Sequence, residues 1–343
     1  MVNITISEAS GQFKQLYGDI QVPLASFIEE QEAKDRANCL ALKIFSERTS
    51  TNFAEGYGGL TAAGEMQPVG EGGNPPENSF AQRELKIIEN ETWKSRMQIT
   101  REIIDDAHGD MKRIIQRAGA TKLTSGYYRT IDNFLMGLLG AALGGKDKYT
   151  IGGRDYATTC YDSKCVFSKT HKSGSKTYCN MYADAFSKDV LGKLSTVQQN
   201  VKDESGESWL LKVGEEYDSV DDIAGALLLH VKKAVFEAIG SEKDPGSANN
   251  GFNYLFGQWN VIIHPALNFL IPASGAVPFI LLDSKYNERN DGNVFQNRVS
   301  LEVESHEDKD TKNNVWDAYT RFSGGFVDFR HMIAGGVTGG ETL

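Results

Sequence analysis

Four residues with metal-binding side chains, Cys160, Cys165, His171 and Cys179, are the strongest candidates for chemistry in the sequence. Thiolates and an imidazole are suitable ligands for tetrahedral zinc. Their spacing lacks the close cysteine pair that structural zinc sites favour, so we predict ordinary buried thiols and no metal site. A metal-dependent intracellular enzyme stays open as an alternative, which metal analysis of the purified chain would test.

Other catalytic patterns are missing from the sequence. There is no phosphate-binding glycine loop, and residues 206–210 (GESWL) lack the last glycine of a nucleophile elbow. Asp105 and Asp106 are adjacent, and adjacent side chains on a helix do not face each other, so we assign them to a helix N-terminus instead. The sequence therefore predicts no catalytic residue, no cofactor and no enzyme.

Composition limits the function classes further. The chain has 343 residues, with 36 Lys and Arg against 46 Asp and Glu, and a formal charge of −10. This balance argues against nucleic-acid binding as the main task. Four cysteines do not form a disulfide framework, and neither a signal peptide nor a membrane-length apolar run occurs, so we expect a soluble protein made in a reducing compartment, with no membrane partner.

Residues 52–82 form an unusual segment that is rich in glycine and acidic. It contains seven glycines and three prolines, carries Glu55, Glu65, Glu71 and Glu77, and holds no Lys or Arg. This density of glycine and proline argues against a helix, and ordinary loops are much shorter. A strand pattern follows over residues 82–100. We therefore expect an extended two-stranded arm that projects from the body.

The remaining chain predicts an α+β fold. Residues 24–45 predict a charged helix followed by a strand at 40–45. Residues 107–141 predict a long amphipathic helix of net charge +3, bent or interrupted at Gly119 and Gly126 and ended by Gly144 and Gly145. Residues 146–293 predict an α/β unit with helices at 184–199 and 221–239 and strands at 209–213, 261–264 and 278–282. Residues 294–330 predict a long antiparallel hairpin.

The order of these blocks, from about residue 45 to residue 330, resembles the Hong Kong-97-type major capsid protein of tailed phages, in particular the Mu-like major head protein family. The residues that carry the resemblance are Ile99–Asp106, Gly64–Met66, Phe167–His171, Tyr319–Phe322, Gly325 and Phe329–Arg330.

The resemblance implies five parts. They are an N-terminal arm (1–51), an extended E-loop hairpin (52–99), a P-domain with a long spine helix (100–145), an α/β A-domain (146–293), and return strands to the P-domain with a C-terminal tail (294–343). Such a protein assembles into pentamers and hexamers of an icosahedral shell around double-stranded DNA. It would reside in the virion, after assembly in the host cytoplasm.

The resemblance also implies partners and contact residues. The partners are other copies of the chain, a separate scaffolding protein, a portal, packaged DNA held without sequence preference, and optionally a decoration protein. The contact residues are Gly64, Glu65, Met66, Glu71, Gly72, Gly73 and Glu77 in the E-loop; Asp105, Asp106, Lys112, Arg113, Ile114, Arg117 and Ile131 in the spine region; and Arg321 and Arg330 in the terminal strands.

Two features of this sequence qualify the resemblance. Some family members join subunits through a lysine in the E-loop, but residues 52–82 contain none, so we expect a non-covalent shell. The acidic arm and the basic helix also suggest a charge-complementary contact between subunits, which is our inference from the residues. An encapsulin-like compartment enclosing protein cargo and a monomeric binding domain remain alternatives.

Overall fold

In the computed structural model the chain combines helices and strands, as the predicted α+β class requires. The structure describes residues 3–6, 30–59, 66–75, 77, 85–106, 110–174, 176–202, 226–229, 242–243, 251–253, 256, 260–262 and 277–343. Within these ranges, no helix has both the length and the apolar character that a membrane crossing requires.

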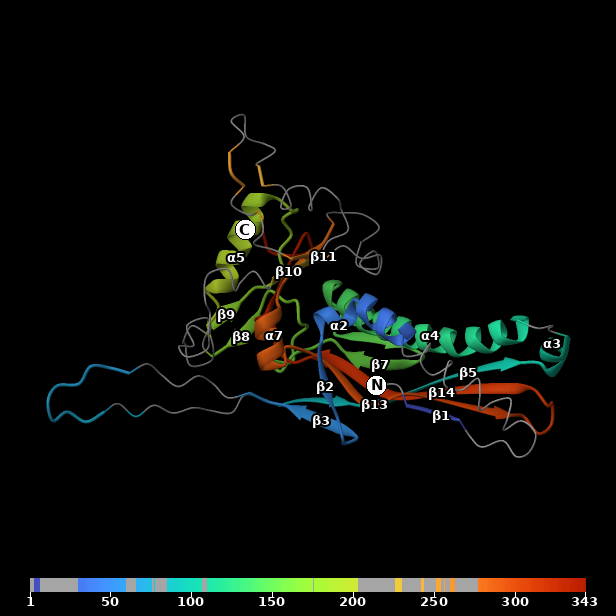
Figure 1. Ribbon diagram of the computed structural model, residues 1–343. Coiled ribbons are helices and arrows are strands. Elements are labelled where there is room, and N and C mark those ends of the chain that lie inside the picture. The colour runs from blue at the N-terminus through green and yellow to red at the C-terminus, as the bar shows by residue number, and fades with distance from the viewer. Residues whose placement is uncertain are drawn as a thin grey trace.

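A five-stranded sheet forms the long body of the molecule (Figure 1). Its strands are β1 (Asn3–Ile6), β2 (Ser46–Thr49), β5 (Glu91–Ile99), β13 (Asn293–Glu307) and β14 (Asn314–Phe326). The order is β1-β13-β14-β5, and β2 also pairs with β13. Strands β13 and β14 form the predicted antiparallel hairpin, and Asp308 closes its turn by accepting hydrogen bonds from Asp310 N and Thr311 Oγ1.

The alternating pattern of the hairpin is only partly regular. Leu301 and Val303 of β13 are buried, and so are Trp316 and Ala318 of β14. Val299 is only partly buried, because register shifts on both sides of it interrupt the alternation.

Helix α4 (Asp110–Leu143) lies along one face of this sheet (Figure 1). The largest core cluster includes side chains from both, and it continues to Ile280 and Met332 of the second sheet. Trp93 of β5 stacks on Phe322 of β14 with ring centroids 5.0 Å apart, and it meets Phe134 of α4 edge-on at 5.3 Å. Full burial of a side chain such as Phe134 or Phe322 contributes about 1.5–3 kcal/mol.

The long helix is confirmed, but two of its predicted details are wrong. The helix continues through Gly119 and Gly126 without interruption. It ends at Leu143, directly before Gly144 and Gly145, and Gly145 has a φ of +66°. Its second half is not simply amphipathic, because Met136, Leu138 and Leu139 are all fully buried. The sheet covers one side of this half, and α2 (Ala41–Ile44) packs on it as well.

The predicted strand at residues 40–45 is wrong. Residues 30–38 are helical, α2 follows, and the strand begins only at Ser46. Asp132 of α4 accepts hydrogen bonds from the Ala41 N–H at 2.8 Å and from the Cys39 thiol at 3.2 Å. This partly buried contact fixes a helical turn that the local apolar pattern does not predict.

Asp105 and Asp106 do not begin the long helix. They lie at the end of a separate short helix, α3 (Arg101–Asp106), and α4 starts at Asp110. Asn313 of the β13–β14 turn accepts a hydrogen bond from the Arg101 N–H at 3.1 Å. A tertiary contact thus satisfies a free N–H at the start of α3, and the carboxylates fall at its other end.

A second sheet, of order β11-β10-β12-β15, lies apart from the first. Its strands are β10 (Ala226–Leu229), β11 (Asn260–Ile262), β12 (Phe279–Asp283) and β15 (Met332–Gly335). Around it lie α5 (Lys188–Gln199), α7 (Ser284–Asn290), and the hairpins β6 (Lys148–Ile151) with β7 (Arg154–Ala157) and β8 (His171–Ser173) with β9 (Lys176–Tyr178).

The predictions for this region have mixed outcomes. Helix α5, with Ser187 as its N-cap, and strand β12 are confirmed, and β11 overlaps the strand predicted at 261–264. The helix predicted at 221–239 is wrong over β10, because a short apolar run does not distinguish a helix from a strand that pairs on both edges. Its other residues, and the strand predicted at 209–213, lie outside the described residues.

Candidate functional site

The arm is built on a two-stranded antiparallel ribbon of β3 (Ala54–Tyr57) and β4 (Lys86–Glu89). Ile88 is buried with Val294 and Val327, and these contacts fix the ribbon to the body. Glu55 accepts hydrogen bonds from Ser50 Oγ and from the N–H groups at residues 51 and 52, which lowers the pKa of its carboxyl group. Glu55 therefore belongs to the root of the arm.

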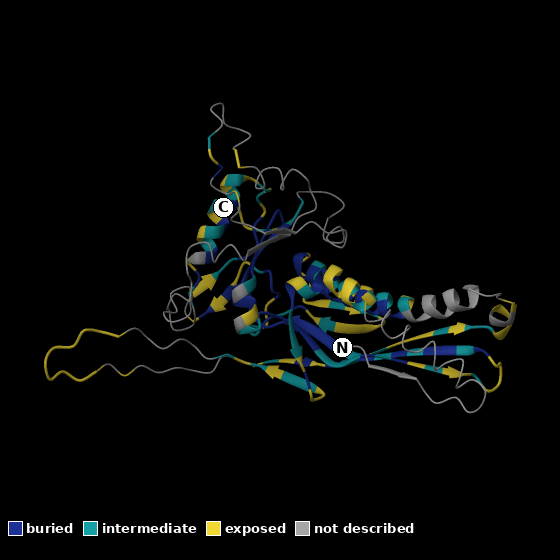
Figure 2. Cartoon of the chain, in the orientation of Figure 1, coloured by how far each residue is buried: buried dark blue, intermediate teal, exposed yellow. Residues whose placement is uncertain are grey.

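The described outer part of the arm, residues 66–75 and 77, has no core of its own and is exposed throughout (Figures 1 and 2). The side chain of Met66 is 97% exposed and that of Val69 is 52% exposed. Gly73 N–H donates to Gly70 O at 2.8 Å and Gly72 has a φ of +77°, so the glycines form a tight turn next to Glu71.

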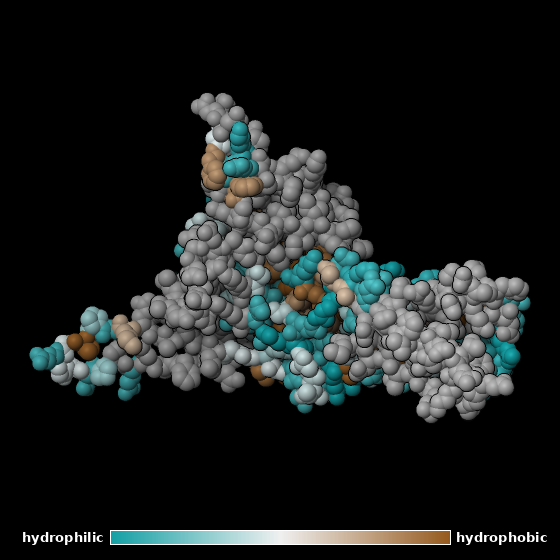
Figure 3. All heavy atoms as spheres, viewed as in Figure 1, coloured by the Kyte–Doolittle hydropathy of each residue, from teal (hydrophilic) through white to brown (hydrophobic). Residues whose placement is uncertain are grey.

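Apolar and acidic side chains thus lie side by side on the arm (Figure 3), since Glu71 and Glu77 are also exposed. The predicted contact residues Gly64 and Glu65 lie outside the described residues. A segment that exposes Met66 and Val69 in this way gains burial only by contact with another surface.

Helix α3 lies at the opposite end of the long body from the arm (Figure 1). Its Ile103 side chain is 52% exposed, and Asp106 is exposed as well. The side chains of Asp105, Lys112, Arg113, Ile114 and Arg117 lie outside the described residues, although their backbones belong to α3 and α4.

Two of the predicted contact residues are wrong because they lie inside the subunit. Ile131 is 1% exposed and packs in the core between α4 and the sheet. Arg330 is 1% exposed and lies between β14 and β15, not in a terminal strand. Arg321 does lie in β14 and is partly buried.

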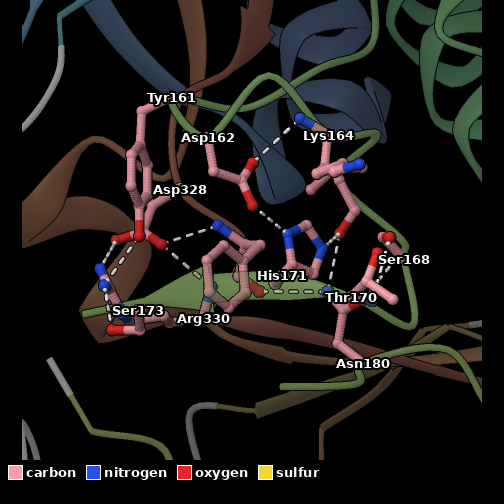
Figure 4. A network of polar contacts seen from close by, with 12 residues as sticks. Tyr161, Asp162, Lys164, Ser168, Thr170, His171, Ser173, Asn180, Asp328 and Arg330 are labelled. Atoms are coloured by element: carbon pink, nitrogen blue, oxygen red, sulfur yellow. Dashed lines mark hydrogen bonds and ion pairs between the residues drawn. The ribbon is translucent and has the colours of Figure 1, made fainter. Parts of the chain in front are cut away.

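The guanidinium of Arg330 is the centre of a buried polar network (Figure 4). It donates to Asp328 Oδ2 at 3.0 Å, to Tyr161 Oη at 2.8 Å and to Ser173 Oγ at 2.9 Å. Tyr286 of α7 also donates to Asp328 at 2.6 Å. A buried cation is compensated by an anion and hydroxyl acceptors, which is the condition for its stability.

His171 joins a second part of this network (Figure 4). Its Nδ1 lies 2.7 Å from Asp162 Oδ2 and its Nε2 lies 3.2 Å from Val166 O. Asn180 donates to three backbone oxygens, those of Val166, Phe329 and Met332. The network connects the segment at 161–180 with residues 328–332, which lie between β14 and the start of β15.

Cys160, Cys165, His171 and Cys179 do not form a site. Among the described residues no group of three or more His, Cys, Asp and Glu side chains is arranged to hold a metal ion. Cys165 donates to Ala142 O at 3.3 Å and Cys179 to Met181 O at 3.3 Å. Burial raises the pKa of the thiols of Cys160 and Cys165, and that of Cys179 to about 11, which disfavours reactive thiolates.

An exposed arm, a long sheet and helix, and a rigid buried junction are features of a structural protein. The comparison with protein families agrees: the family described as phage capsid protein matches residues 84–335. This range is most of the chain and includes the second sheet and strands β5, β13 and β14 of the first, so the chain belongs to the phage capsid protein family. The major capsid protein predicted from the sequence is confirmed, and the enzyme and the nanocompartment are not favoured.

A search of solved structures matches this chain to capsid proteins at low sequence identity. One match is the capsid of an empty GTA particle, which is 13% identical in sequence to this chain and has a TM-score of 0.49. The alignment covers 89% of this chain and 90% of the GTA capsid chain. Another match is a chain from the structure of Mycobacterium phage Patience, with 12% sequence identity and a TM-score of 0.47. This alignment covers 98% of our chain and 92% of the phage chain. A search of the curated proteins gives no match.

Proposed function

We propose that this capsid protein has the Hong Kong-97-type architecture and forms pentamers and hexamers of a closed shell around double-stranded DNA. In this proposal residues 1–51 are the N-terminal arm, 52–99 the E-loop, 100–145 the P-domain with α4 as spine helix, 146–293 the A-domain, and 294–343 the return strands and tail. Strand β15 pairs with β12, so the last segment also contributes to the sheet of the A-domain.

The observation that carries the proposal is the position of the arm. The arm leaves one end of the body and α3 lies at the other (Figure 1). When two different surfaces of identical subunits meet, the contact is head-to-tail, and a rotation that closes produces a ring. An arm that reaches past its own subunit therefore supports assembly into rings rather than a monomer.

The proposed receptor for the arm is the end of the neighbouring subunit formed by α3 and the first half of α4. The arm carries Glu71 and Glu77 with no cation between residues 52 and 82, and this half of α4 carries Lys112, Arg113 and Arg117. Helix α3 is itself acidic, with Glu102, Asp105 and Asp106, so the complementary charge comes from α4 alone. The exposed Ile103 gives Met66 and Val69 an apolar partner there. In this contact the apolar side chains supply the affinity, and the complementary charges fix the position of the arm along the helix of the neighbouring subunit.

The shell would be held without covalent bonds between subunits, because the arm carries no lysine at its tip. A separate scaffolding protein, a portal and a decoration protein are further proposed partners. Assembly in the host cytoplasm and residence in the virion follow from this role.

A pair of engineered cysteines tests the arm contact. With Met66→Cys and Ile103→Cys in one chain, oxidation should produce a ladder of linked multimers ending at the five- or six-subunit ring. The matched control combines Met66→Cys with Lys193→Cys on the exposed side of α5 and should give no ladder. Equal ladders from both variants, or none from the first, would contradict the proposed contact.

A further inference from the structure

Strand β4, at the root of the arm, has an inverted distribution of polar and apolar side chains. Lys86, Ile88 and Asn90 alternate on its inner side and are partly or fully buried. Leu85, directly before the strand, and Ile87 lie on the outer side and are 53% and 59% exposed. A ribbon with one side in water normally exposes its polar side chains and buries its apolar ones. The outer side of this ribbon therefore has the composition of a covered surface.

Contacts of the inner side fix this orientation. Lys86 Nζ donates to Thr159 Oγ1 at 3.0 Å, and burial lowers the pKa of this lysine. Asn90 Nδ2 donates to Ser50 Oγ at 2.8 Å, and Ile88 between them is buried. A shift of one residue in the strand pairing would exchange the two sides and break these contacts. The apolar side chains are thus held outward.

The outer side of the ribbon has small side chains on β3 and little charge. Ile87 pairs with Gly56, and Glu89 pairs with Ala54. The Leu85 side chain lies against Gly56, where an added Cβ would approach its Cδ1 to 3.1 Å. Glu89 is the only charged residue on this side of the ribbon, and it lies at the end that leads into β5. We call the surface formed by Ala54, Gly56, Leu85 and Ile87 the ribbon face.

Assembly of a capsid indicates which molecule covers the ribbon face. Copies of the same chain surround each subunit of a capsid, so a second copy is always within reach. The proposed contact of the arm with α3 and α4 is head-to-tail and closes a ring, so joining rings into a shell requires a further contact. A contact across a twofold axis is isologous, which means that the same patch of two subunits meets itself.

An isologous contact needs a surface on which no charge meets its own copy. The ribbon face satisfies this condition, because all of its residues are uncharged. A second candidate is the edge of β5, which ends the first sheet among the described strands. The exposed side chains of Lys94 and Arg96 lie along β5, and charged residues on an edge strand oppose pairing with another strand. The ribbon face is therefore the better surface for such a contact.

We propose that the ribbon face packs against the ribbon face of a subunit in the adjacent ring, around a local twofold axis. The contact buries Leu85 and Ile87 of both subunits and joins two rings. It is separate from the contact of the arm with α3 and α4, which closes each ring. The inference rests on the proposed function for the existence of these rings.

Single cysteines test the symmetry of the contact in the assembled full-length chain. Oxidation of Leu85→Cys or Ile87→Cys should produce dimers and no larger ladder, because the new cysteine lies close to its own copy. Met66→Cys alone should produce no dimer, since a head-to-tail contact places this position beside a different residue. Lys193→Cys on the exposed side of α5 is the second control. Absence of dimers from both ribbon variants, or equal dimers from the controls, overturns the proposal.

A charge on the ribbon face distinguishes a contact between rings from a contact within a ring. Ile87→Glu places two carboxylates across the axis, so electron microscopy should show free pentamers and hexamers in place of shells. The matched control, Thr92→Glu at an exposed position of β5, should form normal shells. Mixing rings of the Ile87→Glu chain with rings of an Ile87→Lys chain should restore shells, because opposite charges then meet.

Three outcomes of this second experiment overturn the proposal. Normal shells from Ile87→Glu would show that the ribbon face is not covered. Loss of rings together with shells would assign the face to a contact within the ring, and no recovery on mixing would assign it to a different protein. Failure of the unmodified chain to form rings counts against the proposed function, whereas normal shells without cross-linked dimers count against this inference alone.

Discussion

The imidazole ring of His171 lies parallel to the phenyl ring of Phe329, with centroids 3.8 Å apart and planes inclined by 5°. Phe329 precedes Arg330, and both lie between β14 of the first sheet and β15 of the second. The stacked rings and the ion pair of Arg330 with Asp328 therefore connect the two sheets through one buried junction. Variants of this junction should affect the stability of the whole subunit.

Replacing Arg330 by Met should destabilise the subunit by about 3–5 kcal/mol, because Asp328 stays buried without its cation. Urea unfolding of unassembled chain measures this loss. Arg96→Met is the matched control, since Arg96 pairs with Asp317 at the exposed surface, and it should change the stability little. Similar losses in the two variants would show that the buried junction has no special role.

Replacement by alanine should change the stability of the subunit in opposite directions at two glycines of α4. A Cβ at Gly126 would meet open space, so Gly126→Ala should stabilise the helix by about 0.5–1 kcal/mol. A Cβ at Gly137 would overlap the ring of Tyr149, so Gly137→Ala should cost about 1–3 kcal/mol. Thermal unfolding of both variants checks the signs. A stabilising Gly137→Ala would mean that Tyr149 is not packed on α4.

His331 should make the stability of the subunit fall in acid. Burial lowers the pKa of this imidazole to about 4 from an ordinary value of 6.5, so the unfolded chain binds the proton more strongly. Stability should therefore be complete above pH 6.5 and decrease toward pH 4, by up to about 1.4 kcal/mol per pH unit from this group.

The comparison of wild type with His331→Phe isolates this effect. Neither nitrogen of His331 has a hydrogen-bond partner among the described residues, so the phenyl ring removes the titration without breaking a bond. Urea unfolding between about pH 7 and pH 4.5 should show a weaker pH dependence for the variant. Parallel curves for the two proteins would contradict the assignment.

Charge reversal on the arm should block assembly without unfolding the subunit. Replacing Glu65, Glu71 and Glu77 by Lys removes the proposed attraction to the basic half of α4. Light scattering should show loss of large particles while the urea midpoint is unchanged. The neutral Gln versions should be intermediate. Normal assembly of the Lys version would rule out the charge-complementary contact.

Strong local patterns are enough to predict the arm, the long helix, the β13–β14 hairpin, α5 and β12. Tertiary contacts explain most of the differences. Asp132 holds a helical turn at Ala41 where the local pattern predicts a strand, and Asn313 binds the start of α3 so that Asp105 and Asp106 fall at its end. Neither partner is near in sequence, so no local pattern contains this information.

The candidate site is less predictable from the sequence. The exposure of Met66 and Glu71 agrees with a contact surface, whereas Arg330 and Ile131 are internal. The burial of Arg330 depends on Asp328, Tyr161 and Ser173, and two of these come from segments far away in sequence. The resemblance implies a contact role for Arg330, and arginine is rarely buried unless it is paired, so the sequence favours an exposed position.

The most direct test of the central claim is electron microscopy of the purified full-length chain, expressed alone and with scaffolding protein. The account predicts closed shells built from rings of five and six subunits, with the arm of each subunit lying on α3 and α4 of its neighbour. Uniform monomers under both conditions, or shells in which the arm lies on its own subunit, would contradict it.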